Sequence, residues 1–223
     1  MIYLNAVLNQ QFAPDTLPDA VRAALGKPLR RASSLSQLAV AGALACVPAD
    51  RRHLPTALLW QSSSGSRLET TALLEEVCNG PAEPLPYDFL ATQPAIAAAQ
   101  LQPYLPGLVN ASHWPLADEK AAHWSLLLSL ARNWLAEGRY AQVLCAHLDR
   151  WADIAHGHWL LLGTMPSGDA IVLDAPSDTP ADAQAADTPD FPRQLADWLH
   201  NGTRRLLLHS PAAARLAVEF ARH

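Results

Sequence analysis

The chain has 223 residues, half of them apolar, and a formal net charge of −5. That length allows one large domain or a domain with an appendage, and the apolar fraction allows a substantial core. The negative charge gives no reason to expect nucleic acid or an anionic membrane surface as a partner.

The start of the chain and its cysteines indicate a cytoplasmic protein. Residues 1–9 lack the basic start of a secretory signal and run directly into a strand-like pattern. No uninterrupted apolar run is long enough to span a bilayer. The three cysteines, Cys46, Cys78 and Cys145, are scattered and odd in number. They fit buried thiols in a reducing compartment better than a disulfide framework.

Taken in chain order, the sequence alternates strand-like and helix-like segments. We expect strands at residues 2–8, 56–60, 108–112, 141–148, 159–162, 170–173 and 205–209, and helices at residues 15–25, 35–46, 68–77, 91–101, 118–138, 192–199 and 212–221. This alternation predicts a layered α/β fold. A stretch rich in Ala, Asp, Pro and Thr predicts a linker at residues 176–191. The linker would join a domain of residues 1–175 to a helix–strand–helix addition, residues 192–223, packed on the same domain.

One helix is expected to organise the fold. It begins near Asp118, a good N-cap residue, and ends at Gly138. Apolar residues cover most of its circumference, which is typical of a buried helix. The strand that follows, residues 141–148, is apolar almost throughout, as a strand covered on both faces would be. We therefore expect a buried central helix between layers.

Four segments occur in an order and at a spacing typical of one enzyme family. They are LLWQSSSGSRLETTALLEE (residues 58–76), LPYDFLATQPAIAAAQ (85–100), PGLVNASHW (106–114) and ARNWLAEGRYAQVLCAHLD (131–149). Over roughly residues 1–175, this order resembles the N-terminal half of the β-ketoacyl synthases. The resemblance implies a truncated thiolase-like fold, with a layered mixed sheet and a buried central helix.

The same resemblance implies that the catalytic cysteine is missing. In active synthases this Cys lies at the start of the buried helix, about seventeen residues before the closing glycine, where a helix N-terminus activates a thiol. The corresponding position, counted back from Gly138, is Ala121. No cysteine lies between Cys78 and Cys145, and the chain is too short to hold the C-terminal half that carries the family's catalytic histidines.

The resemblance therefore implies a catalytically silent subunit, a chain-length factor of polyketide, aryl-polyene or fatty-acid-type biosynthesis. It would form a heterodimer with a full-length β-ketoacyl synthase, complete the wall of its acyl tunnel, and meet acyl carrier protein only indirectly. We expect no cofactor and no metal. The candidate tunnel or interface residues are Leu108, Val109, Asn110, Ala111, Ser112, His113, Trp114, His123 and Trp124.

A half-length thiolase fold has a consequence for solubility. It would leave a large apolar face exposed, and such a face generally needs an obligate partner. In the family, the strand that corresponds to residues 108–112 pairs across the dimer, so we expect the partner to cover its open edge. The chain expressed alone is then expected to be insoluble or self-associated.

Two other functions are open. Ser62, Ser63 and Ser64 would suit a small α/β acyl-transfer or hydrolytic enzyme, although they lack the G-x-S-x-G frame of a nucleophile elbow. A stand-alone module that binds acyl carrier protein is the second alternative, and it would bind carrier protein without any synthase.

Four side chains of metal-binding type lie close together in the sequence: His147, Asp149, His156 and His158. Two histidines separated by one residue can reach one metal only on a strand or loop. We interpret them as neutral histidines, surface or buried, rather than as ligands.

Overall fold

Nine strands form one mixed sheet within the residues that the computed structural model describes, which are 1–80, 83–168, 170–177, 180–210 and 216–222. The strands are β1 (Tyr3–Phe12), β2 (Thr56–Ser62), β3 (Leu108–Pro115), β4 (Gln142–Arg150), β5 (Ala155–Gly163), β6 (Ile171–Asp174), β7 (Ala183–Ala186), β8 (Arg205–His209) and β9 (Ala217–Arg222). Their order in the sheet is β3-β2-β4-β5-β1-β6-β9-β8-β7. The β3–β2–β4 group and the β7–β8 pair are parallel, and the other neighbours are antiparallel.

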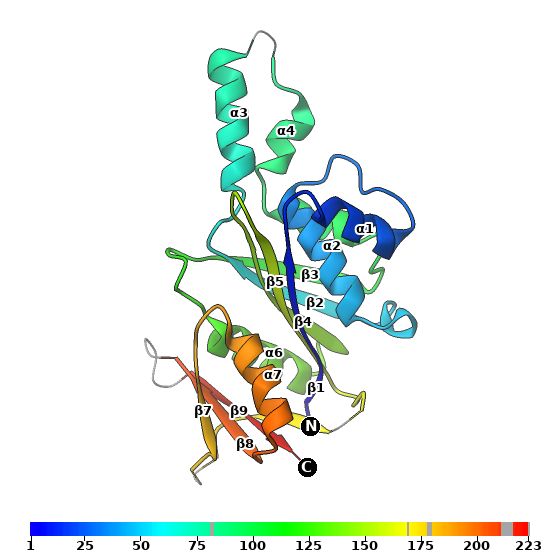
Figure 1. Ribbon diagram of the computed structural model, residues 1–223. Coiled ribbons are helices and arrows are strands. Elements are labelled where there is room, and N and C mark those ends of the chain that lie inside the picture. The colour runs from blue at the N-terminus through cyan, green and yellow to red at the C-terminus, as the bar shows by residue number, and fades with distance from the viewer. Residues whose placement is uncertain (81–82, 169, 178–179, 211–215, 223) are drawn as a thin grey trace.

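Helices cover both faces of this sheet (Figure 1). They are α1 (Leu17–Leu25), α2 (Ser34–Cys46), α3 (Arg67–Asn79), α4 (Pro86–Ala91), α5 (Ala95–Leu101), α6 (Trp124–Ala136) and α7 (Phe191–Asn201), with a short 3-10 turn at Ala49–Arg51. On one face, α2 packs on β4, β5 and β1 and is flanked by α1 and α5, while α6 and α7 cover the other face. Helices α3 and α4 project from one end of the body (Figure 1). This arrangement confirms the expected layered α/β fold.

Strand β4 shows why the central strands are apolar throughout. Val143 and Cys145 face the core around α6, whereas Leu144 and Ala146 face the core around α2. A strand covered on both faces cannot alternate between apolar and polar residues. The expectation of a doubly covered strand is therefore confirmed.

Helix α2 approaches the sheet closely at one glycine. A Cβ atom on Gly42 would lie 2.0 Å from Nε1 of Trp159 on β5. Only a residue without a side chain lets the buried indole occupy this space. The contact fixes how α2 lies across β5.

Helix α6 begins later than the sequence indicated. Its first residue is Trp124, and Asp118 instead accepts a hydrogen bond from the backbone N–H of Lys120 within the preceding loop. The prediction of a helix start near Asp118 is wrong because the N-terminal N–H groups of α6 are bonded to a residue distant in the sequence, Asp187. The predicted stop is confirmed: Gly138, with φ +68°, follows shortly after Ala136.

The tail of the chain also differs from the prediction. The expected helix over 212–221 is wrong for its described part, because β9 (Ala217–Arg222) is a strand between β6 and β8; residues 211–215 lie outside the described part. Val218 and Phe220 alternate into the core, which is a period of two rather than a helical period. The predicted linker contains β7, which pairs with β8. The helix expected at residues 91–101 is the shorter α5, and α4 precedes it.

The tail strands complete the burial of α6. Leu127, Leu128 and Ala131 are fully buried, and α6 packs on β2 and β4 on one side and on β9 on the other. The expectation of a buried central helix between layers is therefore confirmed. Among the described residues, no helix combines the length and the apolar character needed to cross a bilayer.

Candidate functional site

The sequence analysis expects the nucleophile position of the synthases, Ala121, at the start of the buried helix, which is α6. Ala121 lies in the loop between β3 and α6, three positions before Trp124, and its backbone N–H donates to the carbonyl of Asp118 at 3.2 Å. A methyl side chain at this place offers no nucleophile. The nearest sequence neighbours in the loop do not include a cysteine.

The three cysteines lie elsewhere in the fold. Cys46 ends α2, Cys78 lies on α3, and Cys145 is on β4 with its Sγ 3.9 Å from the carbonyl oxygen of Leu127. Burial raises the pKa of Cys46 to about 12 and raises the pKa of Cys145 as well. A thiol that stays protonated is a poor nucleophile, so neither buried cysteine is poised for acyl transfer.

A carboxylate of the chain itself occupies the N-terminus of α6. Asp187 Oδ1 accepts from the backbone N–H of Trp124 at 2.8 Å, and Oδ2 accepts from the backbone N–H and the Oγ of Ser125 at 3.2 and 2.5 Å. Asp187 is buried. A free helix N-terminus binds anions and stabilises negative charge. Here these donors are already bonded, so they cannot stabilise an incoming oxyanion or thiolate.

The side chain of Trp124 fills the space beside this helix end. Its indole is fully buried, its ring lies 6.5 Å from the ring of His147 and 6.2 Å from that of Phe191, and its Nε1 donates to the carbonyl of Pro189 at 3.4 Å. His123, one residue earlier, is exposed, and its backbone N–H donates to Oε1 of Gln61 at 2.8 Å. Both predicted residues therefore lie at the helix start, but only Trp124 points into the interior.

Strand β3 carries the other predicted site residues and lies at one end of the sheet. Leu108 is buried, Ser112 is half-buried, and Val109 and Ala111 are exposed, with 65% of Val109 accessible. Asn110 donates through Nδ2 to the hydroxyl of Tyr140 at 2.8 Å.

Two consecutive ring-bearing residues of β3 point to opposite faces of the sheet. His113 packs on Trp60 with ring centroids 4.0 Å apart, and Trp114 packs against the core around α6. Burial lowers the pKa of His113 to about 4, although the negative charge of Asp149 acts in the opposite direction. His113 is therefore neutral near pH 7.

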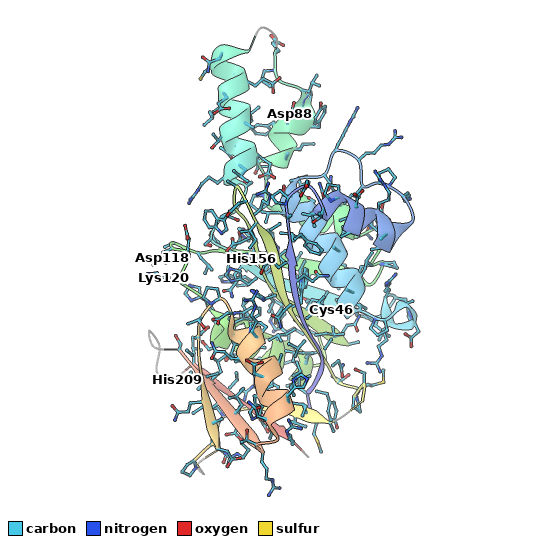
Figure 2. All side chains as sticks on the ribbon, viewed as in Figure 1. Cys46, Asp88, Asp118, Lys120, His156 and His209 are labelled. Carbon is cyan, nitrogen blue, oxygen red and sulfur yellow. The ribbon has the colours of Figure 1, made fainter. Side chains whose placement is uncertain are left out.

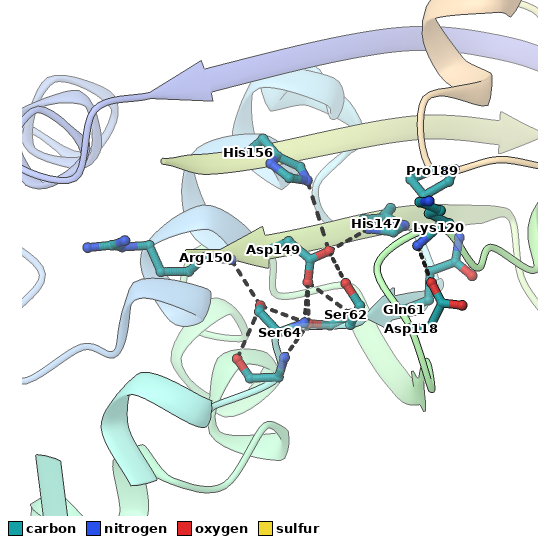
Figure 3. Close-up of polar contacts among 12 residues, drawn as sticks. Gln61, Ser62, Ser64, Asp118, Lys120, His147, Asp149, Arg150, His156 and Pro189 are labelled. Atoms are coloured by element: carbon teal, nitrogen blue, oxygen red, sulfur yellow. Dashed lines mark hydrogen bonds and ion pairs between the residues drawn. The ribbon is translucent and has the colours of Figure 1, made fainter. Parts of the chain in front are cut away.

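A network of hydrogen bonds surrounds Asp149 where β2 and β4 end (Figure 3). Oδ1 accepts from Ser62 Oγ at 2.9 Å and from the backbone N–H groups of Ser63 and Ser64 at 2.9 and 2.7 Å. Oδ2 accepts from Ser63 Oγ at 2.6 Å and from His147 Nε2 at 2.8 Å. Burial alone would raise the pKa of Asp149, but these hydrogen bonds and the proximity of His147 hold it well below its usual range.

The order of groups in this network argues against serine chemistry. In a nucleophilic triad the imidazole lies between the serine and the carboxylate and takes the hydroxyl proton. Here the carboxylate of Asp149 lies between Ser63 and His147, and its lowered pKa makes it a weak base. Ser62 and Ser63 donate to this carboxylate, so they hold the turn after β2 in place.

Sequence reasoning missed the role of Asp187. It lies in the predicted linker, and no local pattern connects it with a helix start 62 positions earlier. The grouping around Asp149 did have a signal. His147 and Asp149 alternate on one side of a short turn and His156 and His158 on the other, which is typical of one face of a hairpin.

Comparison with known proteins identifies the fold. No family model and no curated protein matches the sequence. Among solved structures, a ketosynthase in complex with its chain length factor from Xenorhabdus doucetiae is similar, with 17% identity and a TM-score of 0.57 over 98% of this chain and 99% of that chain.

Two further solved structures have comparable scores. The ishigamide ketosynthase/chain length factor gives 13% identity and a TM-score of 0.56 over 90% of this chain and 83% of that chain. A type II polyketide synthase acyl-carrier protein in complex with its ketosynthase, bound to the hexaketide, gives 10% identity and a TM-score of 0.58. The match covers 100% of this chain and 99% of that chain. The chain therefore has the fold of the thiolase-like ketosynthases.

Proposed function

We propose that this chain is a catalytically silent ketosynthase-like subunit, a chain-length factor that pairs with an active β-ketoacyl synthase in polyketide, aryl-polyene or fatty-acid-type biosynthesis. The observation that carries this proposal is the state of the α6 N-terminus. Asp187 occupies its donors, Trp124 fills the adjacent space, and Ala121, which the family resemblance assigns to the nucleophile position, lies in the loop three positions before the helix. The helix is retained as a packing element, while the groups that acyl transfer needs are missing from it.

The surface supports a partner. We call residues 67–91, which comprise α3 and α4, the arm. Most of the large apolar side chains that are exposed in the described part of the chain lie on it: Leu68, Leu74, Val77, Leu85, Tyr87, Phe89 and Leu90. Exposed apolar patches generally mark interaction sites, and we infer one on the arm. The partner that fits the proposal is a full-length β-ketoacyl synthase.

The open edge of β3 supports the same partner. β3 ends the sheet, so one row of its backbone N–H and C=O groups has no neighbouring strand among the described residues. An uncovered edge strand is prone to pair with other chains, and natural proteins usually cover it. A synthase strand paired with β3 would cover Val109 and Ala111 and extend the sheet across the heterodimer.

In such a complex the chemistry belongs to the synthase. This chain would supply a wall of the acyl tunnel, with β3 and the start of α6 as the nearest elements, and would limit how far the acyl chain grows. Carrier protein would dock on the synthase and reach this chain only indirectly. No cofactor is part of the proposal. A cytoplasmic location is part of it and is supported by the absence of a disulfide among the three free cysteines.

Co-purification tests the partner. The chain is coexpressed with the full-length synthase encoded nearest to it, and the complex is quantified by affinity capture and size-exclusion chromatography. Val109→Asp and Phe89→Asp should each weaken capture at least tenfold. Met165→Asp changes an exposed apolar residue outside the arm and β3, and it should leave capture unchanged. If Val109→Asp and Phe89→Asp were captured as well as the parent and Met165→Asp, this interface would be refuted.

An acyl-transfer assay tests whether the chain lacks catalytic activity. The chain is incubated with acyl-carrier-protein thioesters and examined by intact-protein mass spectrometry, with the synthase as positive control. We expect an acyl adduct on the synthase and none on this chain. An adduct on Ser62, Ser63 or Ser64 would instead favour the acyl-transfer alternative, and a tight complex with carrier protein alone would favour the binding module.

A further inference from the structure

Four polar side chains share one face of the β4–β5 hairpin. In its antiparallel register, His147 lies opposite His158 and Asp149 lies opposite His156. Residues two apart on a strand point to the same side, so all four lie on the face that α6 covers further along the strands. Their rings form a close group, with centroids of His147, His156 and His158 between 5.5 and 6.4 Å apart.

Three of these side chains, those of His147, Asp149 and His156, bring atoms that can bind a metal ion close together. Nε2 of His147 lies 2.8 Å and Nε2 of His156 lies 4.0 Å from Oδ2 of Asp149, and the three atoms all lie within 4.8 Å of one another. A tetrahedral ion with bonds of about 2.0–2.1 Å needs donor atoms roughly 3.3 Å apart. Reaching that geometry requires the separations between these atoms to change by at most about 1.5 Å.

The surroundings resemble those of a built metal site. His147 and Asp149 are almost fully buried, whereas 20% of the His156 side chain is accessible, which leaves one side open for water. The turn of Ser62–Ser64 holds the Asp149 carboxylate by four hydrogen bonds and so fixes its orientation. Such outer contacts are what metal-binding carboxylates generally have.

The neighbouring histidine is also fixed. Nδ1 of His158 lies 2.7 Å from Oδ1 of Asn9, an acceptor, so His158 carries its proton on Nδ1. The buried Nδ1 of His147 has no hydrogen-bond partner among the described residues. An ion bound through Nε2 would leave this Nδ1–H to a water molecule, since metal-bound imidazoles generally donate their other ring N–H to a partner.

We propose that His147, Asp149 and His156 bind a divalent transition-metal ion, with Zn²⁺ the best fit, and that water completes its coordination. Two imidazole nitrogens and one carboxylate oxygen suit Zn²⁺ better than Mg²⁺ or Ca²⁺, which prefer oxygen donors. In binding, His147 exchanges its hydrogen bond to Asp149 for a bond to the ion. The site joins the ends of β2 and β4 to the start of β5 and is independent of the proposed subunit role.

Metal titration of the full chain tests this site. The 223-residue protein is stripped with EDTA, dialysed and titrated with Zn²⁺, and bound metal is counted by mass spectrometry. Co²⁺ is used in parallel, because its visible d–d absorption reports tetrahedral or five-coordinate binding. We expect one equivalent per chain and an increase in the melting temperature. Binding below one equivalent, or Co²⁺ spectra of the free ion, would overturn the proposal.

Matched variants separate a specific site from surface binding. His156→Gln removes a partly exposed ligand with no short hydrogen bond in the described part of the chain, so the metal-free variant should melt as the parent does. We expect its Zn²⁺ affinity to fall at least about a hundredfold, since even outer-contact changes cost 10–100-fold. His209→Gln alters an exposed histidine distant from His156 (Figure 2) and should not change the affinity. Equal affinities for parent and His156→Gln would refute the site, and Asp149→Asn offers a second check.

Discussion

The body and the arm of this chain are stabilised in different ways. In the body, α6 buries Trp124, Leu127 and Leu128 completely between β4 and the tail strands. In the arm, neither α3 nor α4 has a buried residue, although Val77 and Phe89 are large and apolar, and 59% and 61% exposed. The body thus contains its own core, whereas the arm displays apolar surface that nothing in the described part of the chain covers.

This difference predicts that the body and the arm respond differently to substitution. Most helical stability in proteins comes from tertiary packing, and a free helix of 13 residues such as α3 is marginal in water. The arm should therefore gain stability if the proposed synthase packs on it. Substitutions in the body should change folding, and substitutions in the arm should change association.

The largest effect on folding is expected for Trp124→Ala. Removing a fully buried indole creates a cavity and leaves the rings of His147 and Phe191 without their contact. We expect the free energy of unfolding to fall by about 3–5 kcal/mol. Urea unfolding followed by fluorescence of the remaining tryptophans measures this, with Trp124→Phe as the milder control. A loss below about 1 kcal/mol would mean that the helix start is not part of the body's core.

A smaller effect is expected for Asp187→Ala. The substitution removes the acceptor of the Trp124 and Ser125 N–H groups, and loss of such a cap costs about 0.5–2 kcal/mol. Asp197→Ala, an exposed position on α7, is the matched control and should change stability little. If the two variants unfold at the same urea concentration, Asp187 does not hold the start of α6.

Most elements of the body could be predicted from sequence, because their periodicity and end signals are local. The range 35–46 and the range 205–209 correspond closely to α2 and β8. The start of α6 could not be predicted, because its cap comes from Asp187, far along the chain. β9 was mistaken for a helix because a short Ala-rich segment has ambiguous periodicity, and only its pairing with β6 and β8 decides it.

The candidate site was predicted only in part. The sequence gives alanine at position 121 directly, but it does not give the position of this residue in the loop before α6, because Asp187 sets where the helix starts. The contacts of Asp149 could not be predicted, because the serine turn lies 85–87 positions away from it and only the parallel pairing of β2 with β4 brings them together. Non-local pairing is the information that the sequence pattern lacks.

The stability of the body is expected to depend on pH through His113, which lies on the edge strand β3. Burial lowers the pKa of His113 to about 4 from its ordinary 6.5, so the folded state takes up its proton later than the unfolded state does. The contribution of His113 to the free energy of unfolding should be constant above pH 6.5 and should fall as the pH drops from 6.5 towards 4. Burial also lowers the pKa of His156 and His158, so both residues should add to the loss of stability at low pH. The negative charge of Asp149 acts against the lowering of the pKa of His113.

The variant His113→Gln isolates this contribution. Urea midpoints are measured between pH 7.5 and pH 4.5, and the variant should lose less stability over that range than the parent. His53→Gln alters an exposed histidine and should keep the parental slope. An unchanged slope in His113→Gln would mean that this ring titrates alike in the folded and unfolded states.

The smallest effect on folding is expected in the arm, at Phe89→Ser. The side chain is mostly exposed, so its loss removes little buried surface and should change the free energy of unfolding by less than about 0.5 kcal/mol. Capture by the synthase should nevertheless weaken, since apolar side chains at the centre of an interface account for most of the binding energy. A variant that unfolded as readily as Trp124→Ala would show that the arm belongs to the body's core. A variant that unfolded and bound as the parent does would show that the apolar surface around Phe89 is not where the synthase packs.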